Sequence, residues 1–183
     1  PNQEGIYAHF EAMTKKNDLP IVLYNVPART VTDIKPETVA RLAQLPTVIG
    51  IKDASGDMPR VTDHRLACGP DFCLLSGVDE QSLAFNAAGG RGCISVTANV
   101  APKLCAEFQA ACASGDYDLA RDLNDKLYPL HLALFSDASP GPIKYALSRV
   151  IEGFPTELRL PMTPPSEASR RQVDAALENA GLI

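Results

Sequence analysis

The chain has 183 residues, 45% of them hydrophobic and 21% charged, a composition typical of a globular protein with a sizeable core. Its 17 lysines and arginines against 22 aspartates and glutamates give a net charge of −5 without a basic cluster, which argues against a nucleic-acid partner. No apolar run is long enough to span a bilayer, so no membrane partner is expected. The five cysteines form no CxxC pair and indicate reduced thiols in the cytoplasm, and the three histidines have no metal-ligand spacing.

The sequence begins on Pro1, without a methionine, and enters a helical pattern almost at once. We therefore expect it to be an internal piece of a larger protein.

Strands and helices are predicted to alternate along the first two thirds of the chain. The expected strands cover residues 21–26, 47–54, 72–76 and 92–96, and the expected helices cover 3–16, 36–44, 59–67, 82–88 and 102–113. From about residue 116 the strands cease, and three helices are expected near 116–135, 140–151 and 167–181. Such alternation predicts a parallel sheet with crossover helices, followed by a helical region.

Four strand–helix units are compatible with an open doubly wound sheet or with half of a (β/α)8 barrel. No GxGxxG motif follows a first strand, and no P-loop is present. The glycine cluster Gly89–Gly92 precedes its strand, so it is interpreted as a turn rather than a phosphate site.

The run from Thr47 to Ala54 is almost entirely apolar and predicts a strand buried on both faces. Lys52 lies at its C-terminal end, where α/β enzymes build their sites. Burial disfavours the charged ammonium, and a neutral amine is what Schiff-base chemistry with a carbonyl compound requires. The alternative is a lysine that extends from the strand end into solvent.

Strand alternation places further polar groups near Lys52. Gly50 shares its face and would leave space beneath it, whereas Asp53 should point the opposite way. Tyr24 ends the preceding strand and could relay protons, and Arg29 on the loop beyond could bind a carboxylate through two donors. The alternatives are a core tyrosine and a solvated arginine.

Four segments together resemble the dihydrodipicolinate synthase family, of the class I pyruvate-dependent lyase and aldolase superfamily. They are Tyr24-Asn25-Val26-Pro27-Ala28-Arg29-Thr30, Gly50-Ile51-Lys52-Asp53-Ala54, Leu74-Leu75-Ser76-Gly77 and Gly92-Cys93-Ile94-Ser95-Val96-Thr97-Ala98-Asn99-Val100. The segment 158–164 and the ending 180–183 are similar as well, so the resemblance covers essentially the whole chain.

The resemblance implies a (β/α)8 TIM barrel, with residues 1–115 as its second half and 116–183 as a C-terminal helical domain. It implies condensation of pyruvate with aspartate semialdehyde in lysine and diaminopimelate biosynthesis, without a cofactor, by a cytoplasmic homotetramer. Lys52 would form the Schiff base and Tyr24 would relay protons. Arg29 would bind the semialdehyde carboxylate, and Gly77 and the carbonyl of Ile94 would line the pyruvate site.

Two departures from the family pattern stand out. The family's N-terminal half, which includes a loop that binds the pyruvate carboxylate and a second relay tyrosine, lies outside this sequence, so the 183 residues alone are expected to be inactive. Val78 stands where the family often has an aspartate. The alternatives are a sister enzyme, such as N-acetylneuraminate lyase or a keto-deoxy sugar acid aldolase, and a non-catalytic subunit that binds a keto acid or serves assembly.

Overall fold

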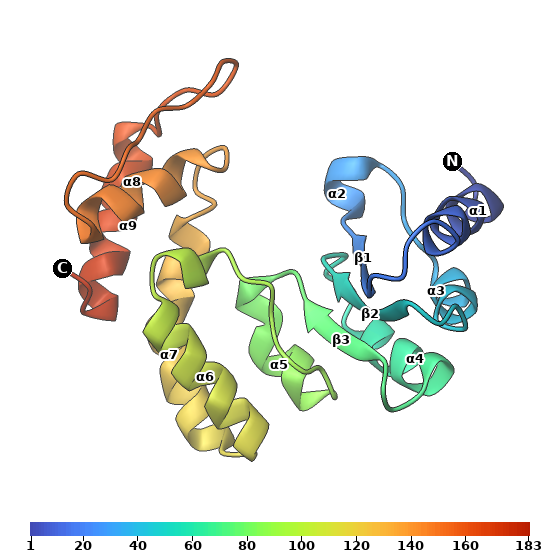
Figure 1. Cartoon of the computed structure of the whole chain (residues 1–183). Helices are drawn as coiled ribbons and strands as arrows, with labels where there is room; N and C mark the ends of the chain where they lie inside the picture. Colours follow the sequence, from blue (N-terminus) through green and yellow to red (C-terminus); the bar gives the residue numbers. More distant parts are fainter. The chain divides into compact units, whose positions relative to one another are not determined.

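The computed structural model describes residues 1–183, which form two compact units, residues 1–94 and residues 95–183. The first unit contains α1 (Gln3–Thr14), β1 (Ile21–Asn25), α2 (Pro27–Thr30), α3 (Pro36–Leu42), β2 (Val48–Asp53), α4 (Pro59–Cys68), β3 (Cys73–Ser76), the 3-10 helix η1 (Asp79–Gln81) and α5 (Ser82–Ala87) (Figure 1). The second contains the 3-10 helix η2 (Thr97–Asn99), α6 (Pro102–Ser114), α7 (Tyr117–Ala133), α8 (Gly141–Val150) and α9 (Glu167–Ala180). The domain boundary predicted at residue 115 stays a prediction.

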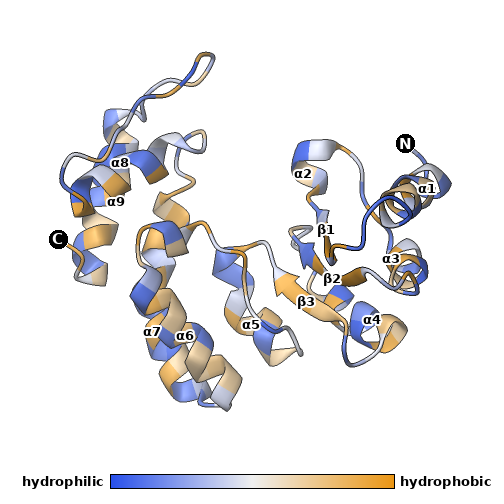
Figure 2. Ribbon diagram, viewed as in Figure 1, coloured by the Kyte–Doolittle hydropathy of each residue, from blue (hydrophilic) through white to orange (hydrophobic).

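The first unit is built on a parallel sheet in the order β1-β2-β3, as the alternation of elements predicted. Tyr24 pairs with Lys52 and Asn25 with Asp53 in the β1–β2 register. The register shifts after Ile21, because Ile49 is an extra residue in β2 and forms a bulge. Figure 2 shows β3 in the hydrophobic colour, in keeping with its residues Cys73, Leu74 and Leu75.

Helices cover only one face of this sheet. Leu23, Ile51 and Leu74, which are in register across the three strands, are 0–2% exposed and belong to a core completed by side chains from α1, α3, α4 and α5. On the other face, Val22 and Tyr24 are 38% and 48% exposed. The prediction that the strands are buried on both faces is therefore wrong for this chain, because no element of the first unit packs on the second face.

Two further predictions need correction. The expected fourth strand at 92–96 is reduced to a single parallel bridge between Ser76 and Cys93, since the chain turns into η2 from Thr97. It still follows β3, with Arg91 N donating to Leu74 O and Ile94 N donating to Ser76 O. The segment 27–30, expected as a loop, forms the short helix α2, which Pro27 starts with a backbone preset for a helix.

The glycine-rich segment Gly89–Gly92 is a connection, as predicted. A side chain at Gly90 would overlap the ring and carbonyl of Phe85, so glycine is required by space there. The Arg91 guanidinium donates to Pro70 O at 2.6 Å, which ties this connection to the segment before β3.

The second unit is helical. The Asp116 and Ser166 side chains cap α7 and α9, and both helices contribute buried leucines to its core, among them Leu127, Leu130 and Leu177. Helix α7 contacts α6 and α9, and α8 contacts α9. None of the helices in the chain combines the length and apolar character that crossing a membrane requires.

Candidate active site

Lys52 and Tyr24 lie side by side on the open face of the sheet. They are directly paired in register at the C-terminal ends of β2 and β1, and the Lys52 Nζ atom lies 4.3 Å from the centroid of the Tyr24 ring. Lys52 is half-buried rather than buried, because the face that it occupies is not covered. The prediction from strand alternation that Lys52 and Tyr24 share one face is confirmed. The Lys52 amine contacts the face of the tyrosine ring.

Backbone hydrogen bonds join the three strand ends that carry the candidate residues. Ala54 N donates to Asn25 O at 2.8 Å, and Gly77 N donates to Asp53 O at 2.7 Å. These bonds extend each strand pair by one residue beyond the sheet. The positions of Tyr24, Lys52 and Gly77 relative to one another are therefore fixed by the backbone.

Gly77 is packed against the lysine side chain. A Cβ atom at this position would lie 3.0 Å from Lys52 Cε and 2.6 Å from the Ala54 Cβ. Any larger residue would overlap Ala54 first and would also press on the Lys52 side chain, so the glycine is required chiefly by the close approach of the Ala54 segment. Similarly, a side chain at Gly50 would overlap the backbone of Cys73, so this glycine allows the close approach of β2 and β3.

Arg29 and Ile94 lie on the segments that follow the neighbouring strand ends. Arg29 is exposed on α2, five positions after Tyr24. Ile94 is 45% exposed and is bonded through its N–H to Ser76 O, next to Gly77. The structure thus brings Lys52 into contact with Tyr24 and beside Gly77, and it places Arg29 and Ile94 at the same end of the sheet without a described contact to Lys52.

A second group of polar residues lies on the covered side of the same strand ends. Asp53 points away from Lys52, as predicted, and its Oδ2 lies 3.4 Å from His64 Nε2 of α4. Burial would raise the pKa of Asp53, but the neighbouring His64 ring and the hydrogen bond from Ser55 N outweigh it and hold that pKa below its ordinary value. Asp53 and His64 are 6% and 1% exposed, so this pair anchors the Lys52 strand to α4.

Cys93 also lies near the candidate site. Burial and the nearby Asp79 carboxylate raise the pKa of its thiol to about 12. The Cys93 Sγ atom is 3.9 Å from Asp79 Oδ1. The side chain is therefore a thiol, not a thiolate, at neutral pH.

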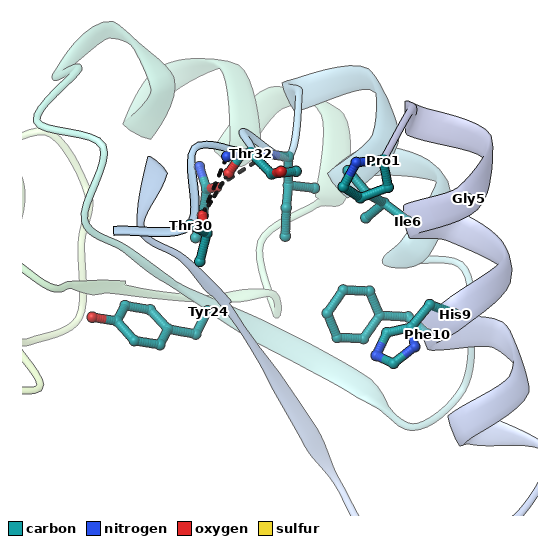
Figure 3. A pocket seen from close by; sticks show the side chains of 10 residues that line it. Pro1, Gly5, Ile6, His9, Phe10, Tyr24, Thr30 and Thr32 are labelled. Carbon is teal, nitrogen blue, oxygen red and sulfur yellow. Dashed lines mark hydrogen bonds between the residues drawn. The ribbon is translucent and has the colours of Figure 1, made fainter. Parts of the chain in front are cut away.

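A cavity of about 360 Å³ lies on the β1 side of Tyr24, between that strand and α1. Figure 3 shows Ile6, His9 and Phe10 on the α1 wall, and Thr30 and Thr32 on the wall formed by the loop after β1. Lys52, Gly77 and Ile94 do not line it. The cavity is mostly apolar and borders the edge of β1 that has no partner strand.

Comparison with known proteins identifies the relatives of this chain. The Dihydrodipicolinate synthetase family matches residues 1–180. The chain is 66% identical over 185 residues to the 4-hydroxy-tetrahydrodipicolinate synthase of Novosphingobium aromaticivorans, and 60% identical over 183 residues to that of Zymomonas mobilis. The chain belongs to the dihydrodipicolinate synthetase family.

Solved structures agree with this assignment. A dihydrodipicolinate synthase from Thermotoga maritima superposes with a TM-score of 0.95 at 40% identity, over all of this chain and 63% of that one. The Acinetobacter baumannii enzyme, crystallised with pyruvate, gives a TM-score of 0.94 at 42% identity, over all of this chain and 62% of that one. The two curated relatives are likewise covered over 62% and 63% of their length, with this chain matched in full.

Sequence reasoning missed one group of residues in this family member. Asn25, Asp33 and Arg60 form a partly buried hydrogen-bonded cluster behind Tyr24. The sequence pattern could have identified Asn25, since a polar residue that follows Tyr24 in a strand must point to the covered face. Arg60 gave none, because an arginine in an amphipathic helix is normally solvated.

Proposed function

We propose that the intact protein is a class I Schiff-base lyase, a 4-hydroxy-tetrahydrodipicolinate synthase that condenses pyruvate with aspartate semialdehyde in lysine and diaminopimelate biosynthesis. The observation that carries the proposal is the placement of Lys52 Nζ over the Tyr24 ring, at the C-terminal strand ends of a chain of this family. The relatives' names and the pyruvate complex of the Acinetobacter enzyme support the choice of substrates.

Lys52 would be the nucleophile. Its neutral amine adds to the C2 carbonyl of pyruvate, and the carbinolamine loses water to give an iminium ion. Loss of a methyl proton gives an enamine, whose carbon attacks the aldehyde of the second substrate and forms the new carbon–carbon bond. The amino group of that substrate then attacks C2 and displaces Lys52, which closes the ring and returns the free amine.

Tyr24 would move protons during these steps. Carbinolamine formation and dehydration each require a proton transfer at oxygen, and a phenol beside the lysine can both accept and donate one. The direct pairing of Tyr24 with Lys52 in the β1–β2 register supports this role. The open face on which both residues lie leaves space for a small keto acid.

Three further residues would bind substrate. Arg29 would pair with the carboxylate of aspartate semialdehyde, for which a guanidinium offers two parallel donors. Gly77 and the Ile94 carbonyl would line the pyruvate site. Their positions on the backbone next to Ser76 support this assignment: Gly77 follows β3, which runs beside the Lys52 strand, and Ile94 N donates to Ser76 O at the end of β3.

The proposed architecture of the intact protein is a TIM barrel with a C-terminal helical domain. Residues 1–115 would supply half of the barrel wall and residues 116–183 the helical domain. The single helix-covered face of the sheet, the unpaired edge of β1 and the cavity beside it support this arrangement, since a barrel needs a strand there. A homotetramer and a cytoplasmic location, which the five free cysteines suit, complete the proposal.

Trapping with pyruvate tests the nucleophile. Borohydride reduction of the intact protein in the presence of pyruvate should give one covalent adduct on Lys52, found by peptide mass spectrometry. Lys52→Ala should give none, while Lys35→Ala, which removes an exposed lysine of the same unit, should leave trapping unchanged. An adduct of equal yield in Lys52→Ala would refute the assignment.

Arg29 separates the synthase from its sister lyases, all of which need the lysine. Loss of a charge-assisted pair with a substrate carboxylate costs about 2–4 kcal/mol, or about 30- to 1000-fold in rate. Arg29→Ala should therefore depress kcat/KM for aspartate semialdehyde by this factor while pyruvate trapping stays intact. Cleavage of N-acetylneuraminate by the wild type, with no use of the semialdehyde, would contradict the synthase proposal.

A further inference from the structure

The segment that carries Arg29 is held together at its two ends by one residue, Asn25. Residues 26–32, here called the Arg29 loop, begin directly after Asn25. The Asn25 side chain donates from Nδ2 to Asp33 Oδ1 at 2.9 Å and accepts from Ile34 N at 3.1 Å. Since Asn25 is 1% exposed, both ends of the loop are closed by one buried amide.

Arg60 of α4 also binds the C-terminal end of the Arg29 loop, at Asp33 and Ile34. Its Nη1 and Nη2 atoms donate to Asp33 Oδ1 and Oδ2 at 2.8 and 2.6 Å, a two-pronged pair, and Nη1 also lies 3.3 Å from Ile34 O. The Arg60 side chain is only 11% exposed and that of Asp33 21%. A pair of this kind fixes direction as well as distance, because the guanidinium is a planar fork.

The Arg29 loop has few other constraints. The hydrogen bonds described for residues 27–32 all remain within the loop, such as Arg29 N to Val26 O and Thr30 Oγ1 to Thr32 O. Val31 at its tip has a φ of 55° and is 94% exposed. The direction in which the loop presents Arg29 therefore depends on the hydrogen bonds of Asn25, Asp33 and Arg60 at the base of the loop.

We propose that Asp33 and Arg60 are positioning residues that hold Arg29 for the carboxylate of the second substrate. This inference rests on the proposed function. Neither residue touches the reacting atoms. They act through Asn25 and the base of the Arg29 loop, on the covered side of the strand ends whose open side carries Lys52 and Tyr24.

The decisive variant is Asp33→Asn, which keeps the shape of the side chain and removes its charge. In the intact protein it should raise the KM for aspartate semialdehyde about 10- to 100-fold, as expected when a binding group is displaced by about 1 Å. The KM for pyruvate and the trapping yield at Lys52 should stay within about twofold of the wild type. The KM for aspartate semialdehyde of Arg60→Lys should lie between those of the wild type and Asp33→Asn, because lysine keeps the charge but lacks the planar two-donor group.

A matched control removes the effect of lost stability. Asp174→Asn breaks a similar cluster in the second unit, where Asp174 accepts from Arg149 Nε and from Tyr145 Oη at 2.8 Å each. It should lower thermal stability, by less than Asp33→Asn because the Arg149–Asp174 pair is more exposed, and leave the KM for the semialdehyde unchanged. An equal rise in both variants would mean that the Asp33 effect is only structural and would overturn the proposal.

A double variant gives the sharpest result. If Asp33 acts through Arg29, then adding Asp33→Asn to Arg29→Ala should raise the KM for the semialdehyde no further than Arg29→Ala alone. Full additivity of the two effects would overturn the proposal. The comparison needs no assumption about how much each residue contributes by itself.

Hydrogen–deuterium exchange provides a readout that does not require turnover. Amides of residues 28–32 should exchange at least about tenfold faster in Asp33→Asn than in the wild type, with residues 95–183 unchanged. If the wild type proves inactive with the semialdehyde, the proposed function fails, and this exchange still decides whether the cluster positions the loop. Unchanged exchange in the loop would overturn the inference in either case.

Discussion

The two faces of the sheet in the first unit differ in what their residues do, although they are made by alternate residues of the same strands. On the covered face, Leu23 and Ile51 are fully buried, and each polar neighbour beyond them has a partner on a helix or loop. On the open face, Tyr24 and Lys52 are partly exposed and contact each other. Stability is therefore concentrated on one face and chemistry on the other, one residue apart in sequence.

Two substitutions, one on each face of the sheet, test this difference with the largest expected effects. Tyr24→Phe should lower kcat of the intact protein about 10²- to 10⁴-fold, the usual contribution of a proton-transfer group, with little change in stability. Ile51→Ala should lower the free energy of unfolding by about 2–5 kcal/mol through the cavity it leaves, with pyruvate trapping retained at permissive temperature. Urea unfolding and steady-state kinetics measure both, and a large loss of stability in Tyr24→Phe would contradict the division.

The reactivity of Cys93 tests whether the covered side excludes water. A thiol pKa of about 12 leaves only about one molecule in 10⁴ as thiolate at pH 8, against about a quarter for an ordinary cysteine. The greater nucleophilicity of a more basic thiolate offsets part of this, so alkylation should be slower by on the order of 10²-fold. Iodoacetamide labelling of the Cys93 peptide in the folded protein and in concentrated urea gives the ratio, and equal rates would show that water reaches the thiol.

Gly77→Ala tests how closely the open face is packed around the lysine. The added Cβ would lie 3.0 Å from Lys52 Cε and 2.6 Å from Ala54 Cβ, so either the lysine or the backbone must shift. We expect pyruvate trapping at Lys52 to slow about 10- to 100-fold, with a loss of about 1–3 kcal/mol in stability. Gly141→Ala is the control, since its Cβ would approach no atom closer than 3.5 Å. A normal trapping rate in Gly77→Ala would mean that the lysine tolerates displacement.

The sequence predicts the local features of this arrangement well. Apolar runs between turn signals give the positions of β1, β2 and β3, and alternation within them gives the shared face of Tyr24 and Lys52 and the opposite direction of Asp53. These features depend only on neighbours along the strand. The half-burial of Lys52 was not predicted, because it depends on whether any element covers the open face.

Features that depend on distant parts of the chain could not be predicted. Asp33 and Arg60 are separated by 27 positions and meet only because α4 packs beside the loop that follows β1. Residues 92–96 have the composition of a strand, but the turn into η2 shortens their pairing with β3 to one bridge. In both cases tertiary packing decides the outcome, and periodicity carries no information about it.

The smallest expected effect is the acid dependence of the Asp33 pair, which lies on the covered side. The Arg60 guanidinium, helped by the Asn25 amide, holds the pKa of Asp33 far below its ordinary value. A carboxyl whose folded pKa is depressed stabilises the fold above its unfolded pKa of about 3.9, and this contribution is lost as the pH falls toward the folded pKa. Hydrogen bonds to charged groups contribute about 1.5–3 kcal/mol, so Asp33→Asn should lose about that much stability near neutral pH.

The gap in free energy of unfolding between the wild type and Asp33→Asn should therefore narrow as the pH falls from about 5 to about 2, because the wild-type carboxylate becomes protonated while the amide does not titrate. Urea unfolding at several pH values measures the gap. Since Arg60 supplies the largest part of the depression, Arg60→Ala should remove most of the pH-dependent part, and adding Asp33→Asn should remove the smaller remainder that Asn25 and Lys35 sustain. A gap that stays constant with pH would mean that the charge of Asp33 does not stabilise the fold, and that the cluster closes the Arg29 loop by shape alone.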